Sequence, residues 1–470
     1  MSEDFSPYSN EDLEELKKRF FQMKEDGSKA YFDVDEYESL IDYFFEEDET
    51  DFIEMTIEYA LDQHPGNYIF LLKKAQLYAL YGNDEKGLEI LDQLTSIGSD
   101  TDYFMVKGSL LSNLQKYREA IEEYTKALNN GEDLEEVYTN IAFEYENLEQ
   151  FDKAIEYLDK VIELNPHNEA ALNEVGLCFE MSNQSEKSLT YFNEKIDQEP
   201  YSRAAWFNLA IAYNSLNKNK KAIEAYKFSL AIDEDQPSAL FNIANIYASM
   251  EEHEKALKYY RETLLQESPD ALTHYYMGES YEKLEDFDKA LICFEKSHEL
   301  NKDFHESLIG ISRSHFLIGN TEKALQYISK AAELPEPFPL FWSIRIMKLD
   351  ERGFYPLAEK IAKQLIKTNP EDHINVINLA LLHRVYNLSL ATQLLQDALL
   401  KFTDDKAQAL LLFLKGLYEM QNNKFEIGYK EFELGIQIHK EEVNNPLIQA
   451  ELTQFSHPLV DRLLELHKLK

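Results

Sequence analysis

Apolar and polar residues alternate along this chain with the period of an α-helix, and the helical stripes themselves recur. In one stretch Trp206, Leu209 and Tyr213 follow one another at intervals of three and four residues. A second stripe, with Ala222 and Tyr226, begins after the polar residues 217–219. The pattern predicts two amphipathic helices joined by a short polar turn.

A shift of about 34 residues superposes this helix pair on its neighbours through most of the chain. The units begin at Val34, Tyr68, Thr101, Glu135, Glu169, Arg203, Pro237, Ala271, His305, Pro339 and His373, and only the interval after Tyr68 is slightly shorter than the others. Small residues recur in two columns of the unit and aromatic residues in two others. Small residues at fixed places allow two helix backbones to approach closely, so we expect each unit to be a helix hairpin packed against the next.

The unit at residues 203–235 has the sequence RAAWFNLAIAYNSLNKNKKAIEAYKFSLAIDED. It carries an early aromatic residue, then Ala210 and Tyr213, then Ala222 and Tyr226. In these places the chain resembles the tetratricopeptide repeats, and the resemblance covers residues 34–442, about twelve units. It implies an all-α fold, a right-handed superhelical solenoid of helix hairpins with capping helices at both ends.

Four segments are expected along the chain. Residues 1–33 form an acidic N-terminal segment with a capping helix over 9–26, residues 34–338 the repeat array, residues 339–442 more divergent repeats, and residues 443–470 a C-terminal capping helix. Pro335, Pro337 and Pro339 at one junction predict a changed angle between two hairpins. The spacing slips after His373, and the last unit aligns best from Ala409.

Charge narrows the range of partners. The 470 residues include 47 Lys and Arg against 87 Asp and Glu, a formal net charge of −40, which excludes a general binder of the nucleic-acid backbone. Residues 1–63 alone have 5 basic against 21 acidic side chains, a net charge of −16. We expect this run to keep the surface soluble, and the alternative is an electrostatic landing site for a basic partner.

No signal peptide and no apolar run of about 18 residues is found, so the sequence predicts a cytoplasmic protein without membrane insertion. Cys178 and Cys293 are too far apart in sequence to suggest a thiolate metal site. The motifs of nucleotide-binding loops, zinc proteases and serine hydrolases are missing. His274, His305 and His315 come from neighbouring units but are expected to be ordinary packing or surface residues. We therefore expect no enzyme activity, cofactor, metal or small-molecule substrate.

In the repeats that this chain resembles, the first helix of each unit lines a concave groove. The resemblance therefore implies a peptide-binding groove with aromatic anchors, backbone-binding amides and charged side chains. The candidate anchors are Phe207, Phe241 and Tyr275, the amides are Asn140, Asn173, Asn208, Asn242 and Asn245, and the charged side chains are Glu279, Glu282 and Arg313. Phe143 is also expected to face the groove. The alternative is that an aromatic residue followed by Asn at these places serves packing within the repeats.

Charge along the same helices favours one kind of guest. Glu146, Glu180, Glu279 and Glu282 outnumber isolated arginines such as Arg313, which disfavours a clamp for the acidic C-terminus of heat-shock chaperones. A protein or peptide partner with basic and apolar residues is expected. The predicted function is a non-catalytic adaptor or scaffold, and the alternative is a regulatory sensor whose superhelix changes pitch when it binds a peptide or a partner domain.

Overall fold

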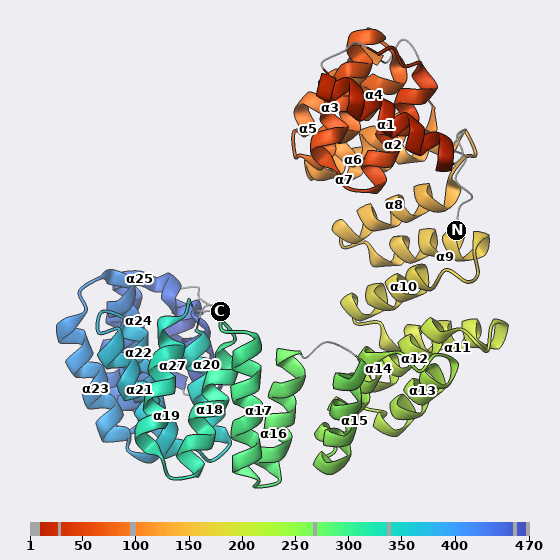
Figure 1. Ribbon diagram of the computed structural model, residues 1–470. Coiled ribbons are helices and arrows are strands. Elements are labelled where there is room, and N and C mark those ends of the chain that lie inside the picture. Colours follow the sequence, from red (N-terminus) through yellow and green to blue (C-terminus); the bar gives the residue numbers. More distant parts are fainter. Residues whose placement is uncertain are drawn as a thin grey trace. The chain divides into compact units, whose positions relative to one another are not determined.

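The computed structural model describes residues 10–26, 30–94, 100–266, 270–335, 340–454 and 458–466. These residues form α-helices and one 3₁₀ helix, and no strand occurs among them (Figure 1). The fold class is therefore all-α, as the sequence predicts. The chain divides into two compact units, residues 1–235 (unit 1) and residues 236–470 (unit 2).

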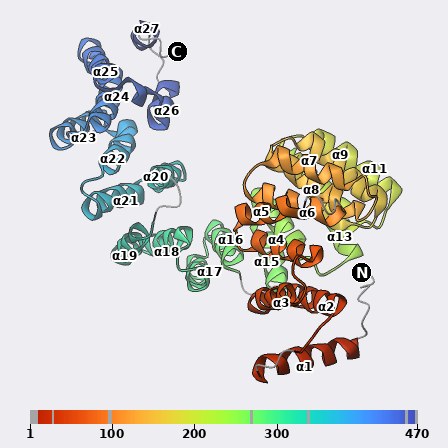
Figure 2. The ribbon, with the colours of Figure 1, turned by 90° about the horizontal axis from the view of Figure 1, so that it is seen from above.

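Unit 1 consists of an N-terminal helix, α1 (Asn10–Asp26), followed by helix hairpins. The hairpins are α2 (Val34–Glu46) with α3 (Thr50–Gln63), α4 (Tyr68–Leu80) with α5 (Asp84–Leu94), α6 (Thr101–Asn113) with α7 (Tyr117–Ala127), α8 (Leu134–Asn147) with α9 (Phe151–Leu164), α10 (Glu169–Met181) with α11 (Ser185–Gln198), and α12 (Arg203–Ser215) with α13 (Asn219–Ile232). The helix α1 lies beside α2 and α3 (Figure 2). Its Leu16 and Phe20 are buried in one cluster with Phe44 and Ile53.

Unit 2 continues the series of hairpins and ends in short helices. The hairpins are α14 (Pro237–Ser249) with α15 (His253–Gln266), α16 (Ala271–Lys283) with α17 (Phe287–Leu300), α18 (His305–Leu317) with α19 (Thr321–Glu333), α20 (Phe341–Glu351) with α21 (Tyr355–Thr368), α22 (His373–Tyr386) with α23 (Leu388–Lys401), and α24 (Asp405–Gln421) with α25 (Phe425–His439). The 3₁₀ helix η1 (Lys440–Asn444) and the helices α26 (Pro446–Gln454) and α27 (Pro458–Leu466) follow.

The helix boundaries match most of the predicted unit starts and depart from a few. The helix α8 begins one residue early, at Leu134, and α24 begins at Asp405, four residues before the predicted Ala409. The C-terminal segment forms two helices instead of one, and Pro458, which has no backbone N–H, is the first residue of the second. Residues 336–339 lie outside the described residues, and with them most of the proline-rich junction where a changed angle is predicted.

Local chemistry explains where the helices begin and turn. The side chain of Asp100 accepts the backbone N–H of Tyr103 at 2.9 Å and caps α6. At the turn after α6, Gln115 has a left-handed backbone with φ of 60°. The backbone N–H of Lys116 then donates to the carbonyl of Leu111 at 2.9 Å, which closes a Schellman motif. A left-handed residue recurs at the corresponding turns of other hairpins, namely at Asp48, Gly82, Glu149, Asn183, Asn217, Glu251, Glu285, Gly319, Gly353 and Asn423.

The small-residue columns lie where the two helices of a hairpin approach most closely. Gly108 of α6 faces the ring of Tyr124 of α7, and Gly278 of α16 faces the ring of Phe294 of α17. A Cβ atom on either glycine would overlap the facing ring. The aromatic residues are fully or almost fully buried, so the small residues give these large side chains their space in the core.

Candidate functional site

The first helix of a hairpin exposes one stripe of side chains, and in unit 1 this stripe includes apolar residues. On α8 and α10 every fourth residue is exposed, in the order Thr139, Phe143, Asn147 and Asn173, Leu177, Met181. The exposed fractions are 54% for Phe143, 47% for Leu177 and 60% for Met181. We call Phe143, Asn173, Leu177 and Met181 the α8–α10 patch.

The sequence prediction includes two of these four residues, Phe143 and Asn173, and misses Leu177 and Met181. A signal for both was available, because Leu177 occupies the position of Phe143 in the next repeat, and Met181 lies one helical turn further along the same face. Exposed large apolar side chains that are gathered in one place are typical of interaction surfaces.

Two carboxylates lie beside this patch. Glu146 of α8 and Glu174 of α10 face each other, and the thiol of Cys178 donates to Oε1 of Glu146 at 3.3 Å. Burial and the neighbouring charge of Glu174 raise the pKa of Glu146 to about 7. Burial and the same Glu146 carboxylate raise the pKa of the Cys178 thiol, so this cysteine is a neutral hydrogen-bond donor at physiological pH.

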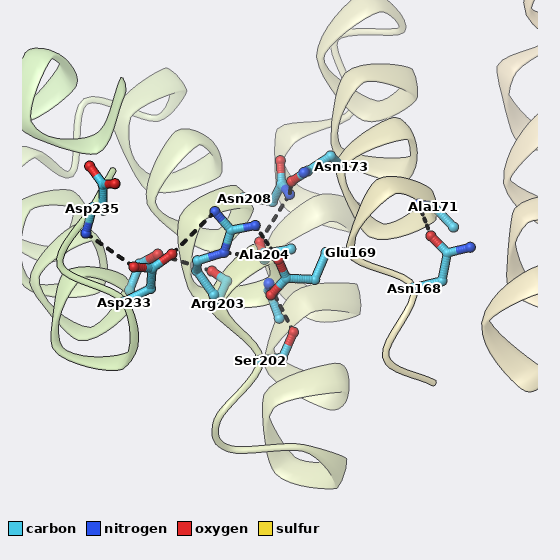
Figure 3. A network of polar contacts seen from close by, with 12 residues as sticks. Asn168, Glu169, Ala171, Asn173, Ser202, Arg203, Ala204, Asn208, Asp233 and Asp235 are labelled. Carbon is cyan, nitrogen blue, oxygen red and sulfur yellow. Dashed lines mark hydrogen bonds and ion pairs between the residues drawn. The ribbon is translucent and has the colours of Figure 1, made fainter. Parts of the chain in front are cut away.

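Asn208 does not present its amide to the surface, contrary to the sequence prediction. It is 4% exposed, and its Nδ2 donates to Oδ1 of Asn173 and to the carbonyl of Ala204, both at 2.9 Å (Figure 3). The Asn208 side chain also lies directly over Gly176, which has no Cβ to displace it. Its amide therefore links α12 to α10 and is not available to a guest.

The same close-up shows an ion-pair network at the beginning of these helices. Nε of Arg203 donates to Oε2 of Glu169 at 2.8 Å, and Nη1 lies 3.7 Å from a carboxylate oxygen of Asp233 (Figure 3). Side-chain caps from Asn168 and Ser202 start α10 and α12 beside it. About a third of the Arg203 side chain is exposed, so this network fastens neighbouring hairpins at the surface.

The predicted aromatic anchors pack within their own hairpins. The rings of Phe207 in unit 1 and Phe241 and Tyr275 in unit 2 are half-buried. Each contacts the buried ring at the corresponding place in the second helix, and the ring centroids are 5.3 Å apart for Phe207 and Tyr226, 5.8 Å for Phe241 and Tyr260, and 5.5 Å for Tyr275 and Phe294. This repeated contact favours the packing alternative for these three positions.

The remaining predicted amides are partly buried. Asn140 on α8 and Asn242 and Asn245 on α14 have intermediate exposure. Oδ1 of Asn245 accepts the hydroxyl of Tyr260 at 2.6 Å, so one side of this amide is already engaged within the hairpin.

The predicted charged residues of unit 2 come together in a four-residue cluster. Arg313 of α18 donates to Glu279 and Glu282 of α16. Arg352, which directly follows α20, donates to the same two side chains, to Oε2 of Glu279 at 3.3 Å and to Oε1 of Glu282 at 3.1 Å. Each of the four carboxylate oxygens thus receives a guanidinium donor. We call Glu279, Glu282, Arg313 and Arg352 the ionic quartet.

The centre of the ionic quartet is buried. Arg313 is only 3% exposed, and Glu282 is buried as well. Burial alone would raise the pKa of Glu279, but Arg313 and Arg352 hold that pKa below its ordinary value. The sequence prediction places Glu279, Glu282 and Arg313 on the groove face, where the two carboxylates select positive side chains of a guest. In the structure these carboxylates are occupied by the chain's own arginines.

A cavity of about 310 Å³ lies next to the ionic quartet, between α16, α18 and the segment from α20 to Arg352. Its lining residues are Tyr275, Glu306, Ile309, Arg313, Arg345, Lys348, Leu349, Glu351 and Arg352. Arg345 donates to Glu306, so one of its nitrogens is already paired. Only Tyr275 and Arg313 of this lining are among the predicted site residues.

A second arginine in unit 2 reaches past one hairpin. Nη1 of Arg384 on α22 donates to both oxygens of Glu451 on α26 at 2.9 Å and to Oε1 of Gln454 at 2.6 Å. Burial raises the pKa of Glu451 although Arg384 opposes the shift.

Neither a metal centre nor a membrane span is found within the described ranges. No group of three His, Cys, Asp or Glu side chains in them is arranged to bind a metal ion. None of the helices in the described part of the chain has both the length and the apolarity needed to cross a membrane.

Models of the tetratricopeptide repeat match residues 101–130, 135–168, 239–272 and 271–304, and a model described as TPR repeat matches residues 210–251. A search of curated proteins finds no match.

Several solved structures are similar to this chain. The C-terminal part of a TPR repeat-containing protein from Cytophaga hutchinsonii is 15% identical, with a TM-score of 0.39, over 51% of this chain and 98% of that chain. The Cut9–Hcn1 hetero-tetramer of the APC/C is 14% identical, with a TM-score of 0.36, over 92% and 100%. MamA is 18% identical, with a TM-score of 0.33, over 34% and 93%.

Proposed function

Because this chain is a tetratricopeptide repeat protein, we propose that it is a non-catalytic adaptor or scaffold that binds a segment of a partner protein along its first helices. The observation that carries this proposal is the α8–α10 patch. Three large apolar side chains on two neighbouring first helices are about half exposed or more, which is typical of surfaces that become covered by a partner.

The chemistry around the patch supports a guest with both apolar and basic residues. Phe143, Leu177 and Met181 offer apolar contact area, and Asn173 of α10 is exposed as well. Among the described residues no Lys or Arg pairs with Glu146 or Glu174, and a basic side chain of a guest would supply the missing cation. The preference for a basic and apolar segment thus rests on unit 1.

The ionic quartet bears on the alternative of a sensor that changes its superhelical pitch. Arg352 links the segment after α20 to α16, so it joins hairpins that are not neighbours. A change of pitch in this part of unit 2 would require both ion pairs of Arg352 to break, one of them with the buried Glu282. We therefore favour a scaffold here.

Selection from a displayed library of random 12-residue peptides tests the proposal. Wild-type chain is expected to enrich peptides that combine Lys or Arg with apolar residues. The double variant Leu177→Ala/Met181→Ala is expected to bind an enriched peptide about 10- to 100-fold more weakly, because each lost apolar anchor costs about 1 kcal/mol or more.

The matched control is Leu164→Ala/Phe228→Ala, which removes two equally exposed apolar side chains from the second helices α9 and α13. This variant is expected to bind the same peptide as the wild type does. Equal loss in both double variants would contradict the assignment of the site to the α8–α10 patch.

The pKa of Glu146 adds a prediction about pH. A basic guest pairs best with ionised Glu146, whose pKa is about 7 in the free protein. Affinity for such a peptide is therefore expected to rise between pH 6 and pH 8, by about 5-fold, with proton release on binding. Titration calorimetry in two buffers of different ionisation enthalpy measures both quantities. Glu146→Gln should remove the pH dependence, and an unchanged dependence in that variant would assign it to another group.

A further inference from the structure

The cavity next to the ionic quartet has an apolar floor and a cationic wall. Ile309 of α18 and Leu349 of α20 form apolar parts of the lining and are 5% and 4% exposed. Arg345, Lys348 and Arg352 follow at intervals of three and four residues, so they form one stripe along α20 and the residue that ends it. At about 310 Å³ the cavity is at the lower limit of ligand pockets and has room for one side chain of a guest.

The hydrogen-bonding capacity of this wall is uneven. The carboxylates of the ionic quartet each receive donors from two arginines, and neither Glu279 nor Glu282 is part of the cavity lining. The arginines have donors left over, because a guanidinium carries five N–H bonds and Arg345 uses one nitrogen on Glu306. Nε of Arg345 is buried and has no hydrogen-bond partner within the described ranges. Among the described residues the ammonium group of Lys348 has no ion-pair or hydrogen-bond partner either, and this side chain is exposed.

An acceptor group therefore fits the cavity better than a donor group does. Glu306 faces the cavity but is paired with Arg345, and Glu351 is exposed at its edge. A carboxylate that enters the cavity would meet Lys348 and the spare donors of Arg345 and Arg352. Charge-assisted hydrogen bonds of this kind are roughly twice as strong as neutral ones.

We propose that this cavity binds the carboxylate side chain of a glutamate or aspartate in the partner segment, with the methylene groups over Ile309 and Leu349 and the carboxylate on Lys348 and Arg345. The inference rests on the proposed function, since it presumes a protein partner, and it adds an acidic residue to the recognised segment. It assigns to unit 2 a preference opposite to that of the α8–α10 patch.

The test uses the full chain with ¹³C-labelled isoleucine methyl groups, so that the Ile309 methyl signal reports on the cavity. An Ile309→Val variant assigns that signal. The probes are N-acetylglutamate methylamide, its uncharged glutamine counterpart, N-acetyllysine methylamide and inorganic phosphate. The glutamate probe is expected to shift the Ile309 signal with an apparent Kd about 10-fold below that of the glutamine probe, because only its charge differs.

Two variants complete the experiment. Lys348→Gln should weaken binding of the glutamate probe about 5-fold or more, and Lys367→Gln, a change of the same charge at an exposed position on α21, should leave it unchanged. Equal binding of the glutamate and glutamine probes, tighter binding of the lysine probe or of phosphate, or no effect of Lys348→Gln would each overturn the inference. The α8–α10 patch belongs to unit 1, so failure here leaves the peptide selection described above as a separate test.

Discussion

Units 1 and 2 are built from the same hairpin but are fastened differently. In unit 1 the side-chain bonds described between hairpins join immediate neighbours, as Tyr191 joins Asp159 at 2.6 Å and Asn208 joins Asn173. In unit 2, Arg352 and Arg384 also reach residues 67 to 73 positions away and so skip one hairpin. The difference shows that the same hairpin occurs in both units, whereas a few long charged side chains in unit 2 add links between hairpins that are not neighbours.

The exposed faces differ in the same way. At one position of the first helices unit 1 has Phe143, Leu177 and Ile211, and unit 2 has Asn245, Glu279 and Arg313. The apolar members of this column lie open on α8 and α10, and the charged members of unit 2 pair with one another. The same column is therefore apolar and exposed on α8 and α10, and charged and internally paired on α16 and α18 of unit 2.

The largest expected effect is on the free energy of unfolding, and it distinguishes the buried Arg313 from Arg203, whose side chain is about one-third exposed. Arg313→Met leaves Glu279 and Glu282 facing each other with one arginine fewer, and should lower the free energy of unfolding of unit 2 by about 3–5 kcal/mol. Arg203→Met in unit 1 removes a surface ion pair and should cost no more than about 1 kcal/mol. Amide hydrogen exchange in α16, α18, α10 and α12 measures both losses within the full chain.

Equal protection losses in the two variants would break the comparison, because they would place Arg203 and Arg313 in equivalent roles. A smaller loss at Arg313 than at Arg203 would reverse it. The double variant Arg313→Met/Glu282→Leu serves as a control, since removal of both partners is expected to recover part of the stability.

A second effect concerns the carboxylate pair of unit 1. Burial and Glu174 raise the pKa of Glu146 to about 7. Between about pH 4.3 and pH 7 the folded state therefore keeps a proton that the unfolded chain has lost. The stabilisation that this proton provides is complete below about pH 4.3 and is lost as the pH rises to 7. Glu146→Gln should therefore raise the free energy of unfolding over that of the wild type, and this gain should be about 1 kcal/mol larger at pH 8 than at pH 4.5 after allowance for solvent screening. Urea unfolding at the two pH values measures the difference.

Glu180→Gln is the matched control, because Glu180 is an exposed carboxylate one repeat further along. A gain of the same size and pH dependence in Glu180→Gln would indicate a general effect of the negative net charge instead of a local effect of the pair.

The smallest expected effect on the free energy of unfolding concerns the left-handed turn residue, which hairpins of both units have. Gln115 in unit 1 and Glu251 in unit 2 occupy the left-handed turn position with φ of 60° and 62°. Glycine adopts this backbone without strain, so Gln115→Gly and Glu251→Gly should each raise the free energy of unfolding, by about 0.5–1 kcal/mol after the entropy of the unfolded chain is counted. Thermal unfolding measures the gain, and Gly82→Ala and Gly319→Ala should show the opposite sign. A gain in one unit only would mean that the hairpins are not equivalent.

The fold could be predicted to a large extent because it is local and repeated. The constant repeat period places the first residue of most hairpins, and the small residues such as Gly108 mark the close contact with the second helix. The departures occur where periodicity gives no information, as at Asp405, where the cap Asp404 starts α24 earlier than the repeat register predicts.

The candidate site could be predicted only in part, because the pattern does not distinguish neighbouring columns on one helix. Phe207 and Phe143 both stand on first helices, yet Phe207 turns its ring toward Tyr226 while Phe143 remains exposed. The partnership of Arg352 with Glu279 depends on the curvature that brings residues two hairpins apart within reach, and this curvature is not encoded in a nearest-neighbour pattern.

The reach of Arg352 also has a mechanical consequence. A hairpin that is fastened only to its neighbours can peel away singly when the stack is pulled from its ends. The hairpins of α16, α18 and α20 are bridged by one side chain, so they must bear a load in parallel and yield together. Under tension this part of unit 2 should therefore be stiff, whereas the hairpins of unit 1 should separate one at a time and at lower force.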